Sequence, residues 1–521
     1  MEGPPPALTS RTLARVCLVA RIVVVGAGMG GLAVAARLRA QGHEVTVCEQ
    51  SDVVGGKLGW FERDGFAFDT GPSLLTLPAV YRDLFLKTGS ALERSVELVP
   101  VDPVCHYRFA DGTELDVPNA SRGRLTAALD EALGAGAGRQ WADFIDRAGQ
   151  IWEVTRGPFL ESPLDGTRTL MRLARRTRDV ATVAPWRTLR GLGSQYLRDP
   201  RLVTLLDRYA TYTGSDPRRA PAALATVPYV EQTFGAWYVR GGLRRLGEAL
   251  HQRVLDVGVT VLTGARVERV LVESGRAVGV RLGDGRTLPA DVVVSNADAA
   301  QLYGELVPDQ AADPARASLA RSTPSLSGFV LLLALRGRTP GLAHHTVLFP
   351  GDYDDEFDSV FGTGPHAGRP RAVPDPTVYV SAPDDPALRP DAEHESWFVL
   401  VNAPRHSTDD PTAGLDWDAP GLASSYADRV LDVMAARGLD VRDRVMWREV
   451  RTPADLARAT GSVGGSIYGS SSNGVRSAFL RPANRSPVPG LFLVGGSSHP
   501  GGGLPLVGLS AAIVAEQIGR A

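Results

Sequence analysis

The sequence predicts an α/β protein in which a discontinuous nucleotide-binding domain carries a second, β-sheet domain and a helical subdomain. Three observations lead to this expectation. A glycine-rich turn joins an apolar run to a helical segment near residue 26, and a second glycine-dense loop precedes an alanine-rich helical segment near residue 500. At 521 residues the chain is also too long for one ordinary hydrophobic core.

The first of these segments has the pattern of a Rossmann-like unit. Residues 22–25 form a continuous apolar run, which is typical of a parallel strand buried on both faces. Gly26, Gly28 and Gly31 then match the spacing G-x-G-x-x-G, with Gly30 inside the motif. The first glycine permits a tight turn, the second lets a pyrophosphate approach the backbone, and the third allows the helix to pack closely.

An acidic residue ends the second predicted strand. The stretch "HEVTVCE" finishes on Glu49, which is followed by Gln50. A carboxylate at this position can accept both ribose hydroxyls of a dinucleotide, and it would repel the 2′-phosphate of an NADP-type ligand. We therefore expect a dinucleotide without that phosphate, with Glu49 and Gln50 beside it.

The next residues favour FAD over NAD. Gly55 and Gly56 lie just beyond the acid, and a short hairpin with its turn at 63–65 leads into "DTGPS" at residues 69–73. An extended ligand such as FAD requires close backbone approach at several points along its length, whereas NAD enzymes have no general need for this arrangement. The additional residues expected at the cofactor are Gly55, Gly56, Lys57, Gly71, Pro72 and Ser73.

Together with further motifs, these segments resemble the bacterial phytoene desaturase and carotenoid desaturase family, within the flavin-containing amine oxidoreductase superfamily. The motifs are "YLRDPRLVTLLDRYATYTGSDPRRAPA", "EQTFGAWYVRGGLRRLGEAL", "DVVVSNAD", "GSIYG", "FLRPANRS" and, most specific to the family, "HPGGGLP". They run from about residue 21 to the C-terminus, with long unmatched stretches between them. The resemblance implies an FAD-dependent desaturase of isoprenoid polyenes such as phytoene or neurosporene.

The C-terminal glycine loop, like the glycine turn near residue 26, leads into the N-terminus of a predicted helix. Backbone N–H groups and the positive end of a helix near Pro505 suit the ribityl chain and the O2/N1 side of a flavin, where reduction places negative charge. The resemblance assigns Gly495 and Gly496 to the ribityl-pyrophosphate part, and Pro505 and Leu506 to the ring. Ser497 and Ser498 stand where many relatives in the superfamily carry an acid, so no carboxylate partner is assigned to ribitol.

The middle of the chain separates the N-terminal glycine motif from the C-terminal glycine loop. Residues 259–298 read as a β-meander that returns to the nucleotide sheet, with turns at 274–275 and 284–285. The resemblance assigns Val267 a backbone contact to adenine, although an inward-facing strand residue fits the pattern equally well. The predicted division is a disordered extension over 1–20, an FAD-binding domain over 21–95, 238–300 and 450–521, a substrate domain over 96–124 and 301–449, and a helical subdomain over 125–237.

The substrate domain should contain a long apolar cleft. Residues 328–337 predict a buried strand, and 376–383 and 396–404 predict its partners in a sheet. The Pro-, Gly- and Asp-rich residues 350–376 between them predict a surface loop.

Composition excludes several partners. The 56 Lys and Arg against 58 Asp and Glu give a net charge of −2, so a nucleic-acid partner is not expected. Three widely spaced cysteines favour a reducing cytoplasm, and the pair His344 and His345 lacks the spacing of a metal site, so no metal is expected. The apolar residues 16–36 contain Arg21 and four glycines and therefore do not predict a membrane span.

One basic stretch suggests contact with a membrane surface. Residues 165–191 hold seven arginines interleaved with apolar side chains such as Met171 and Trp186. A solvated helix face would show the same pattern, but a water-insoluble polyene has to enter from lipid. We therefore expect a cytoplasmic protein that associates peripherally with the membrane.

The expected chemistry is conversion of CH–CH to C=C, with hydride passing to flavin N5 and oxygen or a quinone as terminal electron acceptor. No catalytic residue can be named. Glu231, Tyr238, Arg240 and His499 are candidates because they lie in family-like segments, but structural hydrogen bonds explain such residues more often. The alternatives are an oxygenase, isomerase or saturase on the same scaffold, a flavin amine oxidase, and a non-catalytic prenyl-lipid carrier.

Overall fold

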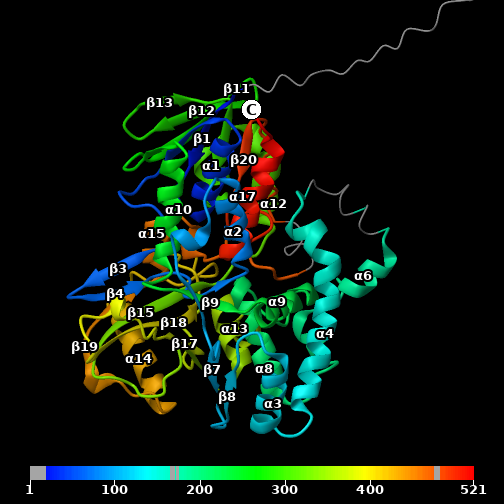
Figure 1. Ribbon diagram of the computed structural model, residues 1–521, viewed down its shortest axis with the longest axis vertical. Helices are drawn as coiled ribbons and strands as arrows, with labels where there is room; N and C mark the ends of the chain where they lie inside the picture. Colours follow the sequence, from blue (N-terminus) through cyan, green and yellow to red (C-terminus); the bar gives the residue numbers. More distant parts are fainter. Residues whose placement is uncertain (1–18, 165–170, 172–174, 475–480) are drawn as a thin grey trace, which may run out of the picture.

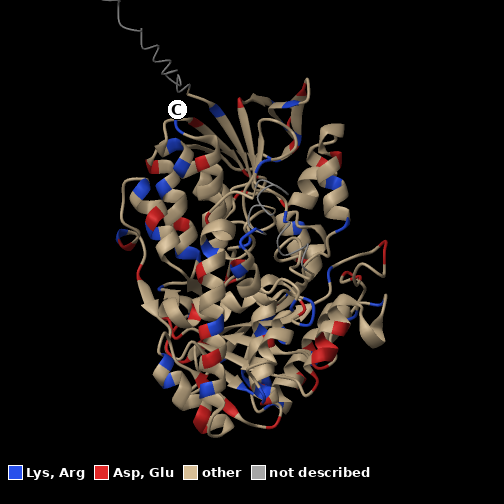
Figure 2. Ribbon diagram, turned by 90° about the vertical axis from the view of Figure 1, so that its right-hand side faces the viewer, with Lys and Arg blue, Asp and Glu red and all other residues tan. Residues whose placement is uncertain are grey.

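The computed structural model describes residues 19–164, 171, 175–474 and 481–521. Of the extension expected over residues 1–20, all but the last two residues lie outside this part of the chain. Figure 1 shows the parallel sheet and its helices in the upper half of the molecule, a mixed sheet at the lower left and a group of helices at the lower right. Figure 2 shows basic and acidic residues interspersed over the outer elements.

The upper half is built on a five-stranded parallel sheet in the order β10-β2-β1-β14-β20. Numbered along the chain, this is the order 3-2-1-4-5 of a Rossmann-like fold. The chain reaches this sheet in three separate passes, at residues 21–48, 260–295 and 491–493. The strands are β1 (Arg21–Val25), β2 (Glu44–Cys48), β10 (Thr260–Leu262), β14 (Val292–Ser295) and β20 (Leu491–Leu493).

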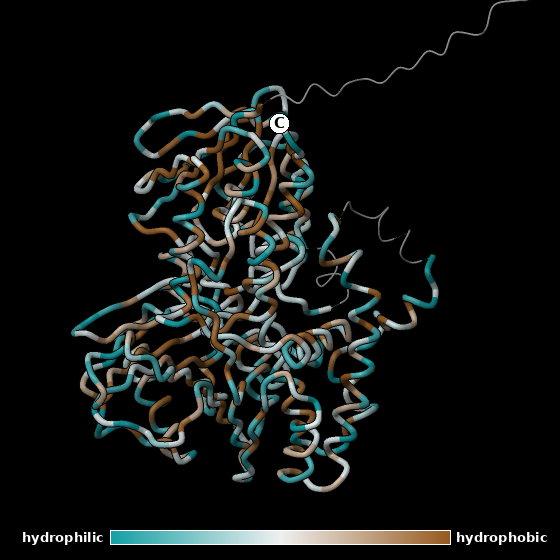
Figure 3. Tube along the Cα trace, viewed as in Figure 1, coloured by the Kyte–Doolittle hydropathy of each residue, from teal (hydrophilic) through white to brown (hydrophobic). Residues whose placement is uncertain are grey.

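Both faces of the parallel sheet are covered, which explains its uninterrupted apolar strands. Ile22 and Val24 of β1 pack against helices, and Val23 and Val25 pack against a separate antiparallel sheet. Figure 3 shows the hydrophobic strands inside this upper half. The helices are α1 (Met29–Ala40), α2 (Ala79–Lys87), α10 (Arg244–Asp256) and α17 (Leu504–Ile518), and the antiparallel sheet comprises β11 (Val267–Glu273), β12 (Arg276–Leu282) and β13 (Thr287–Pro289).

The second sheet has seven strands in the order β19-β15-β18-β17-β16-β7-β8, and only the β16–β7 pair is parallel. The predicted buried strand is β15, which pairs along its whole length with β18. Helix α14 (Leu422–Ala436) packs on one face, and the hairpin of β3 (Trp60–Arg63) and β4 (Phe66–Asp69) packs on the other. The sheet strands are β7 (Cys105–Arg108), β8 (Glu114–Val117), β15 (Ser327–Arg336), β16 (His345–Leu348), β17 (Val378–Ser381), β18 (His394–Ala403) and β19 (Val445–Arg451).

The helices at the lower right pack around α4 (Ala137–Thr155), whose buried Trp141, Phe144, Ala148 and Ile151 follow a helical period. Around it lie α3 (Arg122–Leu133), η2 (Arg156–Leu160), α6 (Thr177–Val183), α7 (Leu189–Gly193), α8 (Pro200–Arg208), η3 (Tyr209–Thr213) and α9 (Thr226–Phe234). A small sheet of β5 (Leu75–Thr76), β9 (Ala236–Val239) and β6 (Leu98–Pro100) joins them to the upper half.

The predicted surface loop over residues 350–376 is wrong in part. It contains helix α13 (Tyr353–Phe361), and Asp352 caps that helix by accepting hydrogen bonds from the backbone N–H groups of Asp354 and Asp355. Tyr353 and Phe357 are buried one turn apart. The flanking Pro and Gly residues dominate the composition and hide this short amphipathic period.

The basic stretch 165–191 is only partly described, because residues 165–170 and 172–174 lie outside the described residues. Arg190 is not available to a membrane, since its guanidinium bonds Asp354 at 2.6 Å and Asp207 at 2.7 Å. Trp186 and Met171 are 65% and 58% exposed. Within the described part of the chain, no helix is both long enough and apolar enough to cross a membrane.

Candidate active site

One cavity of about 1460 Å³ connects the two halves of the molecule. Its upper part lies where β1 and β14 end, at the position where the strand order reverses and open α/β sheets bind their ligands. Its lower part reaches β15, β18, α4 and α9. Its volume exceeds the range of about 300–1,000 Å³ usual for a single ligand, so the cavity has room for two occupants.

The first glycine turn is closed by tight backbone packing. A Cβ on Gly31 would lie 2.0 Å from the carbonyl oxygen of Gly26, and one on Gly28 would lie 2.6 Å from Asn296 Oδ1. A Cβ on Gly30 would lie 3.0 Å from Cα of Gly495 in the C-terminal loop. Gly26, Gly28 and Gly30 line the cavity, whereas Gly31 and Gly495 support it from behind.

Asn296, which sequence reasoning did not single out, joins the two glycine loops. Its Nδ2 donates a hydrogen bond to the carbonyl of Val494 at 2.9 Å, and its side chain contacts the glycines of both loops. The residue follows directly after β14, at the reversal of strand order. That position in "DVVVSNAD" is the signal by which it could have been found.

Glu49 lies in the cavity at the end of β2, beside Gln50. Its carboxylate is already oriented, because Oε2 accepts from the backbone N–H of Ala27 at 2.7 Å and Oε1 accepts from that of Ser51 at 3.0 Å. A carboxylate has about four acceptor sites, so capacity remains for ribose hydroxyls.

The second glycine pair and "DTGPS" also line the cavity, through Gly55, Gly56, Lys57, Gly71, Pro72 and Ser73. Their approach to a cofactor stays a prediction, and two of these glycines have a further, structural reason. A Cβ on Gly71 would lie 1.9 Å from the carbonyl oxygen of Lys57, and one on Gly56 would lie 3.2 Å from Cα of Gly28. Here glycine is required because backbone packs on backbone, and this packing shapes the cavity wall.

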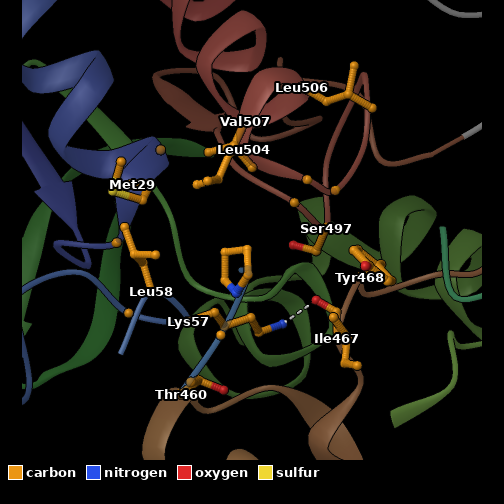
Figure 4. Close-up of a pocket in the computed structure, with 18 of the residues that line it drawn as sticks. Met29, Lys57, Leu58, Thr460, Ile467, Tyr468, Ser497, Leu504, Leu506 and Val507 are labelled. Atoms are coloured by element: carbon orange, nitrogen blue, oxygen red, sulfur yellow. Dashed lines mark hydrogen bonds between the residues drawn. The ribbon is translucent and has the colours of Figure 1, made fainter. Parts of the chain in front are cut away.

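Two cationic side chains line the upper part of the cavity, the half-buried Lys57 and the buried Arg481. Lys57 Nζ donates to the carbonyls of Ser466 and Ile467 at 2.8 Å each, and Figure 4 shows it in the same part of the cavity as Leu504 and Val507. Arg481 donates to the carbonyl of Tyr468 at 2.9 Å. Burial lowers the pKa of Lys57 and lowers that of Arg481 to about 10.

Asp298 is the acidic group that accompanies these cations. The negative charge of its carboxylate raises the pKa of Lys57 and of Arg481, against the effect of burial. Oδ1 accepts from the backbone N–H of Ala300 at 2.9 Å, whereas the buried Oδ2 has no partner among the described residues. Asp298 lies beside Ser497 in the cavity wall. Sequence reasoning missed Asp298 and Arg481, because neither belongs to a glycine loop.

The C-terminal loop and the start of α17 complete the upper wall. Gly496, Pro505, Leu506 and Val507 line the cavity there, and Val267 lines it at the start of β11. Figure 4 shows the side chains of Leu504 and Val507 together at the top of this region, with Leu506 to one side. The wall therefore combines bare backbone, a helix N-terminus and aliphatic side chains.

The four candidate catalytic residues do not lie together. Glu231 and His499 line the cavity. The hydroxyl of Tyr238 donates to Asp385 at 3.0 Å, away from the cavity lining, and Arg240 is a 54% exposed side chain paired with Glu97. Tyr238 and Arg240 thus have structural partners of their own.

The lower part of the cavity is mainly apolar. Its lining includes Trp152, Leu164, Leu224, Val227, Val230, Val330, Phe398 and Leu400. These side chains come from both the mixed sheet and the helices around α4. Such a surface excludes water and suits a long hydrocarbon chain.

Comparison with known proteins agrees with this geometry. The family described as flavin containing amine oxidoreductase matches residues 29–393. A 4,4'-diapolycopene oxygenase of Methylomonas sp is 33% identical, with 96% of this chain and 98% of that protein covered. A hydroxyneurosporene desaturase of Cereibacter sphaeroides is 33% identical over the same shares. A zeta-carotene-forming phytoene desaturase of Myxococcus xanthus is 32% identical, with 96% and 93% covered.

Solved structures share the fold. An oxidoreductase from Methanosarcina mazei matches with a TM-score of 0.60 at 18% identity, covering 95% of this chain and 100% of the other. Putrescine oxidase bound to putrescine matches with a TM-score of 0.59 at 16% identity, covering 96% and 99%. The expected α/β class with a Rossmann-like parallel sheet is therefore confirmed. The chain belongs to the flavin-containing amine oxidoreductase family, among the carotenoid desaturases and oxygenases, and is a flavin-dependent oxidoreductase.

Proposed function

We propose that this protein is an FAD-dependent desaturase that converts CH–CH to C=C in a linear isoprenoid polyene. The observation that carries the proposal is a cavity whose lining extends from the two glycine loops to an apolar arm. The glycine loops suit a dinucleotide cofactor, and the arm suits a hydrocarbon. Carotenoid relatives along the full length of the chain support this choice of substrate.

The upper cavity fits FAD. Glu49 would hold the adenosine ribose, and the backbone at Gly26, Gly28 and Gly496 would approach the diphosphate and ribityl groups. Among the described residues the buried Oδ2 of Asp298 has no donor, and a ribityl hydroxyl would supply one. Asp298 would therefore supply the carboxylate partner for ribitol that Ser497 and Ser498 cannot provide.

Bound FAD would supply an acceptor for the hydride that leaves the substrate. Lys57 and Arg481 would place positive charge near that acceptor, because both line the upper cavity and, among the described residues, neither forms an ion pair within 4 Å. The N-terminus of α17 adds its dipole. Val330, Phe398 and Leu400 hold the polyene and exclude water, which protects the positive charge that develops on the substrate.

We also propose that the helical subdomain rests on a membrane surface. Helix α6 lies beside α4, whose residues Trp152 and Thr155 line the cavity, and Figure 1 shows the two helices next to each other. Trp186 is exposed near α6. Arg175, Arg176 and Arg178 add exposed positive charge that would attract anionic lipid.

The experiment is product analysis of the reconstituted holoenzyme with phytoene or neurosporene in liposomes. A desaturase gives a product that has lost two hydrogens, and it does so without oxygen when a quinone is supplied as acceptor. A product that has gained oxygen, formed only in air, identifies an oxygenase and contradicts the proposal. An unchanged mass with an altered polyene identifies an isomerase.

A further inference from the structure

The proposed desaturation releases a proton as well as a hydride, and this proton has to leave an apolar cavity. When the hydride leaves one carbon, positive charge develops on the polyene, and the neighbouring C–H bond must then lose its proton. A charged acid left inside the apolar arm would be costly, because a charge in apolar surroundings loses its hydration. The protein therefore needs a path that carries the proton out of the cavity.

Glu231 carries a carboxyl group in the wall of the arm, but its geometry does not suit this task. Its Oε1 accepts a hydrogen bond from the hydroxyl of Tyr209 at 2.7 Å. Its Oε2 is itself buried in the protein, so this atom does not face a substrate in the cavity. The path has to begin elsewhere.

A hydrogen-bonded pair of hydroxyl groups belongs to the cavity wall. Ser73, in the segment "DTGPS", and Tyr379, in β17, both line the cavity, and their hydroxyl oxygens lie 2.5 Å apart. Strand β17 lies inside the mixed sheet, between β18 and β16, yet Tyr379 is only half-buried. Either hydroxyl can donate to the other, so a proton can pass along this hydrogen bond.

Ser73 also lines a second, small cavity of about 20 Å³. This volume is enough for one water molecule, which needs about 10–15 Å³ and two to four polar partners. The small cavity offers such partners, because its lining includes, besides Ser73, the polar side chains of Asp69, Tyr238, Ser381 and Ser396. A water molecule held there would connect Ser73 to Asp69.

Asp69 is the acceptor at the far end of this connection. Its two carboxylate oxygens accept from the backbone N–H groups of Leu243 at 2.6 Å and Arg244 at 2.9 Å, so acceptor capacity remains. Among the described residues, the titratable groups that face it are Arg244, Asp385 and Tyr238. Burial raises the pKa of Asp69 to about 6, so the carboxyl group can take up and release a proton near neutral pH. Asp69 is half-buried and the Arg244 side chain is 39% exposed, which places this end near the surface.

We propose that Tyr379, Ser73, a water molecule in the small cavity and Asp69 form the path by which the substrate proton leaves the cavity. The proposal rests on the proposed function, because it supplies the proton step of that reaction. A C–H bond of the polyene cation breaks, and its electron pair forms the new C=C bond. The proton binds to Tyr379 Oη, while the hydroxyl proton of Tyr379 passes to Ser73, that of Ser73 to the water, and one proton of the water to Asp69. Asp69 then releases its proton to solvent.

The test measures kcat and KM of the holoenzyme with neurosporene in liposomes, without oxygen and with a quinone as acceptor, from about pH 5 to about pH 8. The variants are Tyr379→Phe, Ser73→Ala and Asp69→Asn. Ser73→Ala interrupts the path without touching the hydrogen bonds of Asp69 to α10, so it remains informative if Asp69→Asn is unstable. The matched controls are Tyr426→Phe and Asp358→Asn, whose side chains are mostly buried and lie outside both cavity linings. Thermal unfolding and flavin content are recorded for every variant.

We expect each of the three variants to lower kcat by about tenfold or more with little change in KM, because positioned proton transfer contributes about 10²–10⁴-fold. Both controls should keep the wild-type kcat. In the wild type, kcat should fall as the pH drops below about 6, where Asp69 is already protonated and cannot accept. This acid limb should be absent from Ser73→Ala and Asp69→Asn, whereas a merely structural defect would lower kcat at every pH and leave the limb in place.

An infrared titration of the holoenzyme without polyene gives a readout that does not depend on turnover. It should show a carboxyl group with a pKa near 6 in the wild type that is missing from Asp69→Asn.

The proposal is overturned if Tyr379→Phe and Ser73→Ala convert neurosporene at the wild-type rate, if the acid limb persists in Asp69→Asn, or if no such carboxyl group titrates. It is also overturned if Glu231→Gln removes the limb and Asp69→Asn does not, since Glu231 would then accept the proton. In all these cases the polyene still reduces the flavin, so the proposed function stands. If no polyene reduces the flavin of the wild type, the proposed function itself fails.

Discussion

Gly31 cannot carry a side chain without opening the turn that follows β1. In Gly31→Ala the new Cβ would lie 2.0 Å from the carbonyl oxygen of Gly26 and 3.3 Å from Cβ of Asn296, whereas real Cβ atoms essentially never approach closer than 3.0 Å. The helix and the turn must therefore separate by about 1 Å. Overpacking of this kind costs about 1–3 kcal/mol, which exceeds the gain of about 0.8–1.0 kcal/mol from alanine in a helix.

We expect Gly31→Ala to lose up to about 2 kcal/mol of unfolding free energy and most of its flavin, because the turn that shapes the diphosphate site has moved. The assay is thermal unfolding together with the ratio of visible flavin absorbance to protein absorbance. Gly123→Ala is the matched control. It lies in helix α3 with nothing within 4 Å of the added Cβ, so it should be as stable as the wild type or slightly more stable. A Gly31→Ala protein that binds FAD normally and unfolds with the wild type would refute this reasoning.

Three further predictions concern the cofactor, pH and the membrane. Glu49→Gln should lower FAD affinity by about tenfold or more, because a charge-assisted hydrogen-bond acceptor is lost. The control Glu44→Gln, at an exposed position, should leave FAD affinity unchanged. Titration of the apoprotein with FAD measures the affinity of both variants. Burial raises the pKa of Asp69 to about 6. The unfolding free energy of the wild type, relative to that of Asp69→Asn, should therefore fall by about 1–3 kcal/mol between pH 4 and pH 6.5. Urea unfolding at each pH measures this difference. Trp186→Ser should weaken sedimentation with anionic liposomes about tenfold, whereas the equally exposed Leu86→Ser should not.

The sign of the pH effect follows from the proton count. The folded state keeps a proton on Asp69 up to about pH 6, but the unfolded state releases it near 3.8. The stabilisation is therefore complete below pH 3.8 and is lost as pH rises through 6. A relative stability that is constant over this range, equal FAD affinity in Glu49→Gln, or unchanged liposome binding in Trp186→Ser would contradict the corresponding prediction.

The sequence was sufficient for the parts of the fold that are encoded locally. The strand, glycine turn, helix and second strand up to Glu49 lie within about 30 residues, and each glycine has a steric role that its spacing reveals. The hairpin turn at 63–65 and the meander turns at 274–275 and 284–285 were equally local, because Gly, Asp and Ser at positive φ mark them.

The residues that complete the site could not be predicted in this way. Asn296, Asp298 and Arg481 act on loops up to a few hundred residues away, and only the folded chain brings them together. Lys57 was assigned to the cofactor because it follows Gly55 and Gly56 in the sequence. In the structure its Nζ donates to the carbonyls of Ser466 and Ile467, which lie more than 400 residues further along the chain.

The most direct test of the central claim is an anaerobic single turnover of the purified flavoprotein with a linear polyene in liposomes. The account predicts that the oxidised flavin absorption bleaches while a polyene with one more conjugated double bond forms in equal amount. A protein that binds flavin but is reduced by amines and not by any polyene would contradict it, as would a protein that binds no flavin.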